Sequence, residues 1–588
     1  MSALLLDAPQ NQKFLADVSK YLLELEGCLK RQPFFAAARA TGSMPARGSG
    51  DFFIQCIEAL ENAFAPNLNA YSTMRWMYYL RRMPNKVFRG DLASTAPNAR
   101  ALIEVYANRS TKLESAIYGS KGFVFPVNES TLRHIARFVA FIIIIYDLHV
   151  GFRLSSKGFD FSFASVGAQR PGKWPIKGRL THTPMACPAP TILPQRVADS
   201  VLASAVETYD QRHDAHKHTF LSAVMSRAGL AHDNITETDN KPSLDVSRAY
   251  WGLLEKEVAV SPQPFLEGHP CAEHYGSNGK VLARFAPSNL DLERIFELYR
   301  LPAMATVGID PDTCVCLIVL LLGGRWLQAS PYSILRALEL GYFIVNLESW
   351  RRFGKRQYEA VCAEIREVLP QLEAPDNFEA FSAVCMTSKG EVWPTAHGAP
   401  AKATNDYMCI DMWAASMGFL ASFQFPKLQG NIANTRAAKF EDVVQEAVNR
   451  TRWGNTEHRG LRQRPLRING QDLTDIDAIG SYDRTLLVIS CKSIPYTREY
   501  DQGTHNTIRN AASTVDKGVE FWAGIVDQLS ANRTGDNFDF SGYNRIVGVV
   551  CTPFAVYTSN AQSLSIALEE LRWACSLDEL IEFLEGRQ

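Results

Sequence analysis

The residue types best suited to catalysis lie in the last third of the chain, on two neighbouring segments that we expect to be strands. The stretch LTDIDAIGSYDRTLLVISCKS places Asp477 in an alternating apolar pattern, followed by a turn at residues 480–484 and an apolar strand at residues 486–489 that runs on to Lys492. A lysine at the end of such a strand must reach water, pair with an acid or shift its pKa with its neighbours. The pattern predicts an acid on one strand that faces a lysine on the next.

A second carboxylate comes from the helix predicted ahead of these strands. The segment KFEDVVQEAVNR, residues 439–450, has apolar side chains on one side and Glu441 in its first turn. A carboxylate there is favoured by the helix dipole and can extend over the sheet edge toward Asp477. On the strand, residues two apart share a face, so we expect Ser490 and Lys492 to lie together.

These residues resemble the PD-(D/E)XK nuclease superfamily, in which a helix carries Glu, a strand carries Asp, and an apolar strand ends in an acid, any residue and Lys. The resemblance covers about residues 426–560. It implies a restriction-endonuclease-like α/β core, a mixed sheet flanked by helices, that hydrolyses phosphodiester bonds with Mg²⁺, or with Mn²⁺ as a substitute. It assigns Asp477 and Glu441 to the metal and Lys492 to the attacking water. A metal there would neutralise the phosphate and lower the pKa of the bound water.

Ser490 stands where the superfamily usually has Glu or Asp, and we include it in the catalytic set. Some restriction enzymes of the superfamily also have Ser there and recover the charge from a carboxylate on the following helix. Asp475 is one candidate metal ligand, since it shares a strand face with Asp477. The other candidates follow Lys492 and are Glu499, Asp501, Asp516 and Glu520. If none substitutes, the site binds metal weakly or is inactive.

Arginines gather between the helix and the strands. Residues 450–467 hold six arginines against one acid, Glu457. Arg side chains suit phosphate, and neutralising several phosphates supplies the sequence-independent part of nucleic-acid affinity. The predicted nucleic-acid contacts are Arg452, Arg459, Arg462, Arg464 and Arg467. The alternative is a solvated loop with charges at a helix end.

The composition limits the class of protein. A length of 588 residues exceeds one hydrophobic core, and a hydrophobic fraction of 46% indicates globular domains. The formal net charge is −1, so any nucleic-acid surface must be a local patch. The first residues lack the basic region of a signal peptide, and the cysteines form no CxxC pair, so we expect a cytoplasmic protein without a membrane span.

The pattern along the chain predicts a largely helical N-terminal half ahead of the α/β core. We divide it into a helical unit at 1–125, a helical region with a Pro-rich loop at 126–260, a mixed α/β region at 261–425 and the nuclease-like unit at 426–588. Further expectations concern single elements: a buried core element at Phe138–Tyr146, helices from about Gln195 to Val258, a strand at Phe381–Met386, a helix at about 507–529, a strand at 546–551 and a helix at Ser563–Trp573.

The predicted function is a metal-dependent DNA endonuclease, with RNA left open as a substrate. The first 425 residues would supply target recognition, regulation or contacts to an accessory protein or a second copy of the chain, and host defence or DNA processing would suit that layout. Two alternatives remain. One is a nucleic-acid-binding or scaffold protein that retains a degenerate nuclease fold, as Ser490 suggests. The other is a structural ion pair in an unrelated α/β enzyme.

Overall fold

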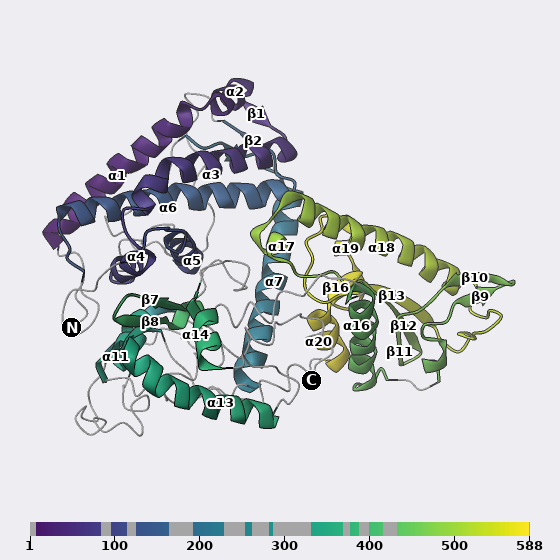
Figure 1. Ribbon diagram of the computed structural model, residues 1–588. Coiled ribbons are helices and arrows are strands. Elements are labelled where there is room, and N and C mark those ends of the chain that lie inside the picture. Colours follow the sequence, from purple (N-terminus) through teal and green to yellow (C-terminus); the bar gives the residue numbers. More distant parts are fainter. Residues whose placement is uncertain are drawn as a thin grey trace.

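The structure is a computed structural model, and it has a helical N-terminal part, a mixed middle part and a C-terminal α/β unit (Figure 1). The residues that it describes are 8–83, 96–114, 125–163, 192–227, 253–260, 281–285, 331–368, 377–386, 399–415, 432–454 and 457–586. Most of the predicted Pro-rich loop, up to residue 191, lies outside these ranges.

The N-terminal part is built around one long helix, α6 (Glu129–Ser156), which begins where the side chain of Asn128 accepts a hydrogen bond from the backbone N–H of Thr131. Helices α1 and α3 pack along it (Figure 1). The other elements of this part are α1 (Ala8–Lys30), α2 (Pro33–Thr41), α3 (Ala46–Leu68), α4 (Thr73–Leu80), α5 (Ala96–Ala107), α7 (Ser200–Arg227), and the small sheet of β1 (Ser43–Met44), β2 (Phe161–Ser162) and β3 (Gln195–Arg196).

Helix α6 contains the apolar run Phe138–Tyr146, and this run is a buried core element as predicted. Among the described residues, α6 is the one helix long and apolar enough to cross a membrane, but 72% of its apolar window is buried inside the fold. Phe64 of α3 stacks on Phe141 with ring centroids 4.1 Å apart. Gly151 lets a second aromatic ring approach, since a Cβ there would lie 2.4 Å from Cζ of Phe53. The isoleucines of α6 are thus buried in close packing inside the fold.

The middle part combines helices with two small antiparallel sheets, as expected for a mixed α/β region. One sheet has the order β6-β8-β7, and the other pairs β4 with β5. The elements are β4 (Leu253–Val260), β5 (Val281–Phe285), α11 (Pro331–Leu340), β6 (Tyr342–Asn346), α12 (Leu347–Ser349), a π-helical turn (Trp350–Gly354), α13 (Lys355–Val368), α14 (Phe378–Met386), β7 (Ala401–Ala403) and β8 (Tyr407–Asp411).

Two predictions in the middle part are wrong. The predicted strand at Phe381–Met386 belongs to helix α14, which buries Phe378, Phe381, Ser382 and Cys385. That spacing of three and four is helical, and a short apolar run alone does not distinguish a strand from a buried helix. The end of the helical stretch predicted to reach Val258 is a strand instead, because β4 covers Leu253–Val260, while residues 228–252 lie outside the described ranges. Its sequence LLEKEVAV has no alternating pattern that would identify a strand, since three consecutive charged residues separate two apolar runs.

A buried ionic cluster joins the helical part to the middle part. The guanidinium of Arg81, after α4, donates to Glu104 of α5 and to Asp411 at the end of β8, each at 2.9 Å. Lys402 of β7 adds a second cation 3.2 Å from Asp411. Burial opposes ionisation of Asp411, but the charges of Arg81 and Lys402 outweigh it and lower the pKa of this carboxyl to about 2. Buried charges in such a cluster depend on one another for compensation.

The C-terminal unit contains a four-stranded mixed sheet flanked by helices, as predicted. The sheet order is β11-β12-β13-β16, with an antiparallel first pair and parallel later pairs. Helices α16 and α20 cover one face, and α18 covers the other (Figure 1). The elements are α16 (Ile432–Asn449), β9 (Leu466–Ile468), β10 (Gln471–Thr474), β11 (Ala478–Tyr482), β12 (Thr485–Cys491), α17 (Arg498–Gln502), α18 (His505–Ala531), β13 (Arg545–Thr552), β16 (Ala574–Ser576) and α20 (Leu577–Glu585). The predicted helix at 507–529 and strand at 546–551 therefore lie within α18 and β13.

Two local predictions in this unit need correction. The turn between β11 and β12 is tighter than predicted, because only Asp483 and Arg484 leave the ladder, with φ of 45° and 56°. Gly480 lies in β11, where a Cβ would approach Cγ1 of Val448 to 2.6 Å, so it allows α16 to pack closely. The helix predicted at Ser563–Trp573 is instead a short helix α19 (Ala561–Leu564) and the strands β14 (Ile566–Leu568) and β15 (Leu571–Arg572), joined by a turn with Glu569 at φ 50°.

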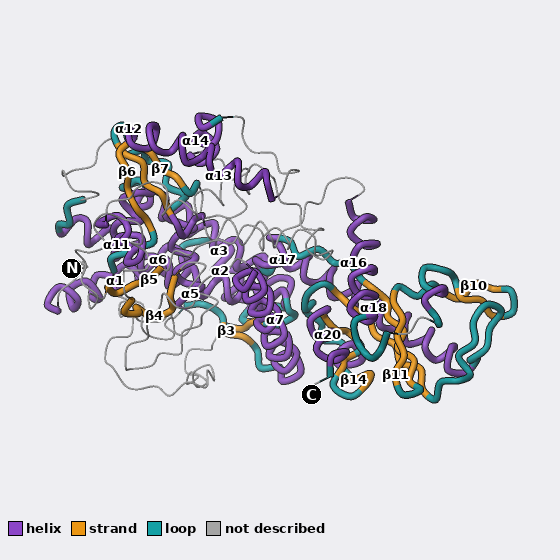
Figure 2. Tube along the Cα trace, turned by 90° about the horizontal axis from the view of Figure 1, so that it is seen from below, coloured by secondary structure: helices purple, strands orange, loops and turns teal. Residues whose placement is uncertain are grey.

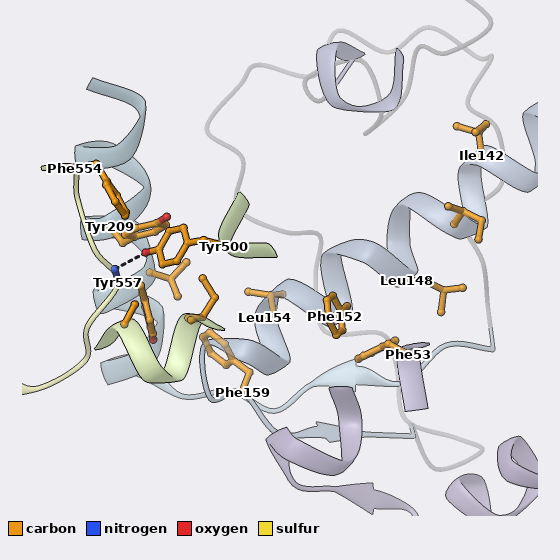
Figure 3. Packing of buried hydrophobic residues seen from close by; sticks show 14 of the residues in the cluster. Phe53, Ile142, Leu148, Phe152, Leu154, Phe159, Tyr209, Tyr500, Phe554 and Tyr557 are labelled. Carbon is orange, nitrogen blue, oxygen red and sulfur yellow. Dashed lines mark hydrogen bonds between the residues drawn. The ribbon is translucent and has the colours of Figure 1, made fainter. Parts of the chain in front are cut away.

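The C-terminal unit shares a hydrophobic cluster with helices α6 and α7 (Figure 3). Tyr209 of α7 meets Tyr557 edge to face at 5.7 Å, and the backbone N–H of Tyr557 donates to the Tyr500 hydroxyl at 2.9 Å. The Tyr557 hydroxyl donates to the carbonyl of Lys157, just after α6, at 2.8 Å. The C-terminal unit is therefore packed on the helical part through polar and aromatic contacts together.

Candidate active site

Asp477 lies immediately before β11, where its side chain reaches the end of β12. The ladder between the two strands ends at the pair Ala478 and Ile489, so the backbone N–H of Cys491 lies beyond it. The Asp477 carboxylate accepts that N–H at 2.5 Å and also lies 3.4 Å from the Ser490 hydroxyl. The carboxylate thus continues the hydrogen bonding of the strand pair and is fixed at the sheet end.

Lys492 follows β12 and turns its amine back toward Asp477. Its Nζ donates to the Ser490 hydroxyl at 3.3 Å, and its backbone N–H donates to the carbonyl of Cys551 in β13 at 2.9 Å. Gly518 of α18 leaves room for the lysine stem, since a Cβ there would lie 3.2 Å from Cε of Lys492. Ser490 therefore bridges the amine and the carboxylate, in the position where an acid was expected.

Glu441 approaches the same place from the middle of α16. The prediction that it lies in the first turn is wrong, because the helix begins at Ile432, and the helix dipole therefore does not favour its charge. Burial is the largest cause that raises the pKa of Asp477 to about 6, and the charges of Glu441 and Asp475 raise it further. The hydrogen bond from Cys491 and the charge of Lys492 act in the opposite direction. Asp477 is therefore a partly desolvated carboxylate with two acidic neighbours, a setting typical of catalytic and metal-binding groups.

Helix α16 is fixed against β11 by a side-chain amide. Gln445, one turn after Glu441, accepts the backbone N–H of Ile479 at 2.9 Å and donates to the carbonyl of Ile479 at 3.0 Å. It satisfies the open edge of β11, which is the edge strand of the sheet. Since Ile479 is two residues after Asp477, this pairing sets the distance between the two acidic elements. The sequence analysis did not identify it.

The structure thus brings Glu441, Asp477, Ser490 and Lys492 to one end of the sheet. No family model, curated protein or solved structure matches this chain. The chemistry of the site is therefore argued from its own geometry.

The acids proposed to replace the one missing at Ser490 differ in their surroundings. Asp501 accepts the Tyr496 hydroxyl at 2.5 Å, and Asp516 accepts the Ser563 hydroxyl at 2.6 Å. Both carboxylates are thus engaged in structural hydrogen bonds away from the site. The remaining two candidates, Glu499 and Glu520, are exposed.

Asp475 is the one candidate whose charge acts on Asp477, and it is exposed. Within the described ranges, no group of three or more His, Cys, Asp or Glu side chains lies close enough together to hold a metal ion. The expected third carboxylate is therefore not in ligating position in this conformation. Asp477 and Glu441 are the two acids available to a cation.

The arginine-rich segment does not form a uniform patch. Arg462 has its Nε 2.7 Å from the carbonyl of Asp477 and pairs with Asp442 of α16 at 2.6 Å, so it positions the site. Arg467 pairs with Asp472 at 2.7 Å. Arg452 lies over the Tyr482 ring, 4.3 Å from its centroid. The two remaining predicted nucleic-acid contacts are Arg459 and Arg464. Both side chains are exposed, and no ion pair is found for them among the described residues.

The hairpin of β9 and β10 carries part of this segment and projects from the end of the C-terminal unit (Figure 2). Its turn places Asn469 and Gly470 at φ 51° and 78°, and the Gly470 N–H donates to Asp536 at 2.6 Å. Asn537 accepts the backbone N–H of Arg467 at 2.9 Å. The loop before β13 thus braces the hairpin, which follows the exposed Arg459 and Arg464 in the chain.

Proposed function

We propose that the C-terminal unit is a metal-dependent nuclease of the PD-(D/E)XK kind that hydrolyses phosphodiester bonds in DNA. The observation that supports it is the hydrogen-bonded row from Lys492 through Ser490 to Asp477, with Glu441 close enough to raise the pKa of Asp477. An ion pair serving stability alone would bring the lysine directly onto the acid. Here the amine stops at a serine, and two acids repel each other beside it.

The acids fit a divalent ion with a hydrated coordination shell. Mg²⁺ commonly binds through one or two carboxylates together with waters and substrate phosphates. Asp477 and Glu441 would hold it, and Asp475 could complete the shell through a small change in its exposed side chain. When bound, the ion supplies charge neutralisation at the phosphate and a lowered pKa for water. It would also relieve the repulsion between the two carboxylates.

The other side chains of the site have separate roles in binding and positioning. Lys492 has three N–H donors and gives one to Ser490, so the others can orient the attacking water or a phosphate oxygen. The Ser490 hydroxyl accepts from Lys492 and donates to Asp477, and it thereby keeps the amine beside the carboxylate. Gln445 and Arg462 hold α16 and the backbone around Asp477 in register.

A second candidate is a nucleic-acid-binding or scaffold protein with a degenerate nuclease fold. It is favoured by Ser490 and by the lack, among the described residues, of a cluster of three metal-ligating side chains. Binding of nucleic acid without cleavage distinguishes this candidate from the nuclease.

The test compares the full chain with Lys492→Ala and Asp477→Asn on supercoiled plasmid, linear duplex, single-stranded DNA and RNA, in Mg²⁺, in Mn²⁺ and in EDTA. Lys517→Ala is the matched control, since Lys517 is exposed on α18 next to Gly518. We expect cleavage of DNA by the wild type and the control in Mg²⁺ and its loss in EDTA and in both site variants. Activity that survives in both site variants refutes the site. Salt-sensitive binding without cleavage supports the scaffold.

A further inference from the structure

Another cation, the guanidinium of Arg436, lies beside the proposed site. Arg436 stands on α16, five residues before Glu441, and its side chain reaches the chain just beyond Lys492. Its Nε donates to the Ser493 hydroxyl at 3.1 Å, and its Nη2 donates to the Ser493 carbonyl at 3.3 Å. The guanidinium thus lies at the same end of the sheet as Lys492, on the side of α16, whereas the lysine stem packs beside Gly518 of α18.

The charge of Arg436 has no acidic counterpart in the described part of the chain. Its two hydrogen bonds go to one neutral serine, and its Nη1 is buried without a hydrogen-bond partner. Partial burial lowers the pKa of Arg436, with no acid to raise it. Two other arginines of this protein differ in this respect, because Arg81 is held by Glu104 and Asp411, and Arg462 by Asp442.

The Nη1 of Arg436 is a buried hydrogen-bond donor without an acceptor, whereas buried donors are usually paired with one. An anion would supply it. Guanidinium groups match the oxygens of a phosphate with two parallel hydrogen bonds, and such charge-assisted bonds are about twice as strong as neutral ones.

We infer that Arg436 binds a backbone phosphate of the nucleic-acid strand beside the scissile bond and so positions that strand against Lys492. This inference rests on the proposed function. It adds a substrate-anchoring residue on α16 to the two exposed arginines near the hairpin. Helix α16 then carries three roles in order along its length: phosphate anchoring by Arg436, metal binding by Glu441 and docking to β11 by Gln445.

The competing explanation is a tether in which Arg436 merely ties α16 to the segment after β12. Two substitutions separate charge from tether. Arg436→Lys keeps the cation and loses the bidentate contact to Ser493, whereas Ser493→Ala removes the hydroxyl and leaves the cation in place. Arg436→Gln removes the charge. Arg450→Gln is the matched control. Arg450 is the first residue after α16, is exposed and pairs with Glu446.

The experiment measures binding of the full chain to a short fluorescein-labelled DNA duplex in EDTA over a series of KCl concentrations. Each phosphate contact contributes about 0.9 to the slope of log affinity against log salt. We expect Arg436→Gln to bind about tenfold more weakly and to lose about one unit of slope. Arg436→Lys, Ser493→Ala and Arg450→Gln should keep the wild-type slope. Thermal melting of each variant reports folding.

An unchanged slope in Arg436→Gln overturns the inference, and so does a loss of slope in Ser493→Ala equal to that in Arg436→Gln. The result also separates this inference from the proposed function. If the wild type cleaves DNA but Arg436→Gln binds and cleaves as well, the anchor fails and the nuclease stands. If the slope depends on Arg436 but Mg²⁺ gives no cleavage, the phosphate contact stands and the hydrolysis fails.

Discussion

Substitution of Asp477 by Asn tests whether the ionised Asp477 carboxylate lowers the free energy of unfolding. The pKa of Asp477 in the folded protein is about 6, against an ordinary value of 3.8. The native state therefore binds the proton more tightly than the unfolded state does. The ionised carboxylate destabilises the fold above pH 6, this cost fades as the pH falls toward 4, and it is absent below 3.8.

The magnitude follows from the shift of about two pKa units at about 1.4 kcal/mol each, which gives about 3 kcal/mol as an upper bound. Because Asp477 is only partly buried, solvent screening reduces this, and we expect about 1–2 kcal/mol. Asn keeps an oxygen that can accept the Cys491 N–H, so the hydrogen bond at the sheet end is retained. Asp477→Asn should therefore be more stable than the wild type at pH 8 and equal to it near pH 4.

The assay is urea unfolding of the full chain, followed by tryptophan fluorescence, at pH values from 4 to 8 with EDTA present. Asp472→Asn is the control, since Asp472 is exposed and paired with Arg467, and it should give no gain at pH 8. Added Mg²⁺ should stabilise the wild type and not Asp477→Asn, because only the native wild type holds the ion. A variant that is less stable than the wild type at every pH would refute the reasoning about desolvation and repulsion.

Two further substitutions probe how the site and the fold are held. Gln445→Ala leaves the backbone N–H and carbonyl of Ile479 unsatisfied, so we expect a loss of about 2 kcal/mol in urea unfolding and a lower kcat, with Gln528→Ala, an exposed amide on α18, as the control. A Gln445→Ala protein with unchanged kcat would contradict its positioning role. Arg81→Met leaves two buried carboxylates, Glu104 and Asp411, without their common cation, so we expect a loss of about 3–5 kcal/mol and a lower melting temperature. An unaltered melting temperature would show that the cluster does not join the two parts.

The sequence could predict that Asp477 and Lys492 lie close together because strand pairing is local there. Asp477 and Lys492 lie on either side of one two-residue turn, and the alternation of apolar residues sets which side chains share a face. Glu441 could be placed by the apolar stripe of its helix. The helix at 507–529 and the strand at 546–551 followed from the same periodicities, whereas the mixed sheet was implied by the resemblance to the nuclease superfamily.

What the sequence did not reveal depends on contacts between distant segments. Arg462 was grouped with the other arginines by charge alone, but its acid lies twenty residues away on α16. Arg436 was outside the predicted helix, because α16 begins at Ile432 and the apolar stripe becomes evident only from about Lys439. The partners of Arg81 come from α5 and β8, so no local pattern could identify that cluster.

The site is also less separable from the N-terminal half than the composition suggested. The segment between Lys492 and α18 is held at its start by Arg436, through Ser493, and further along by Tyr496, whose ring stacks on His213 of α7 with centroids 5.8 Å apart. Because the position of the Lys492 amine depends on this segment, α7 supports the geometry of the site from outside the sheet. The helical half is thus part of the scaffold that positions the candidate active site.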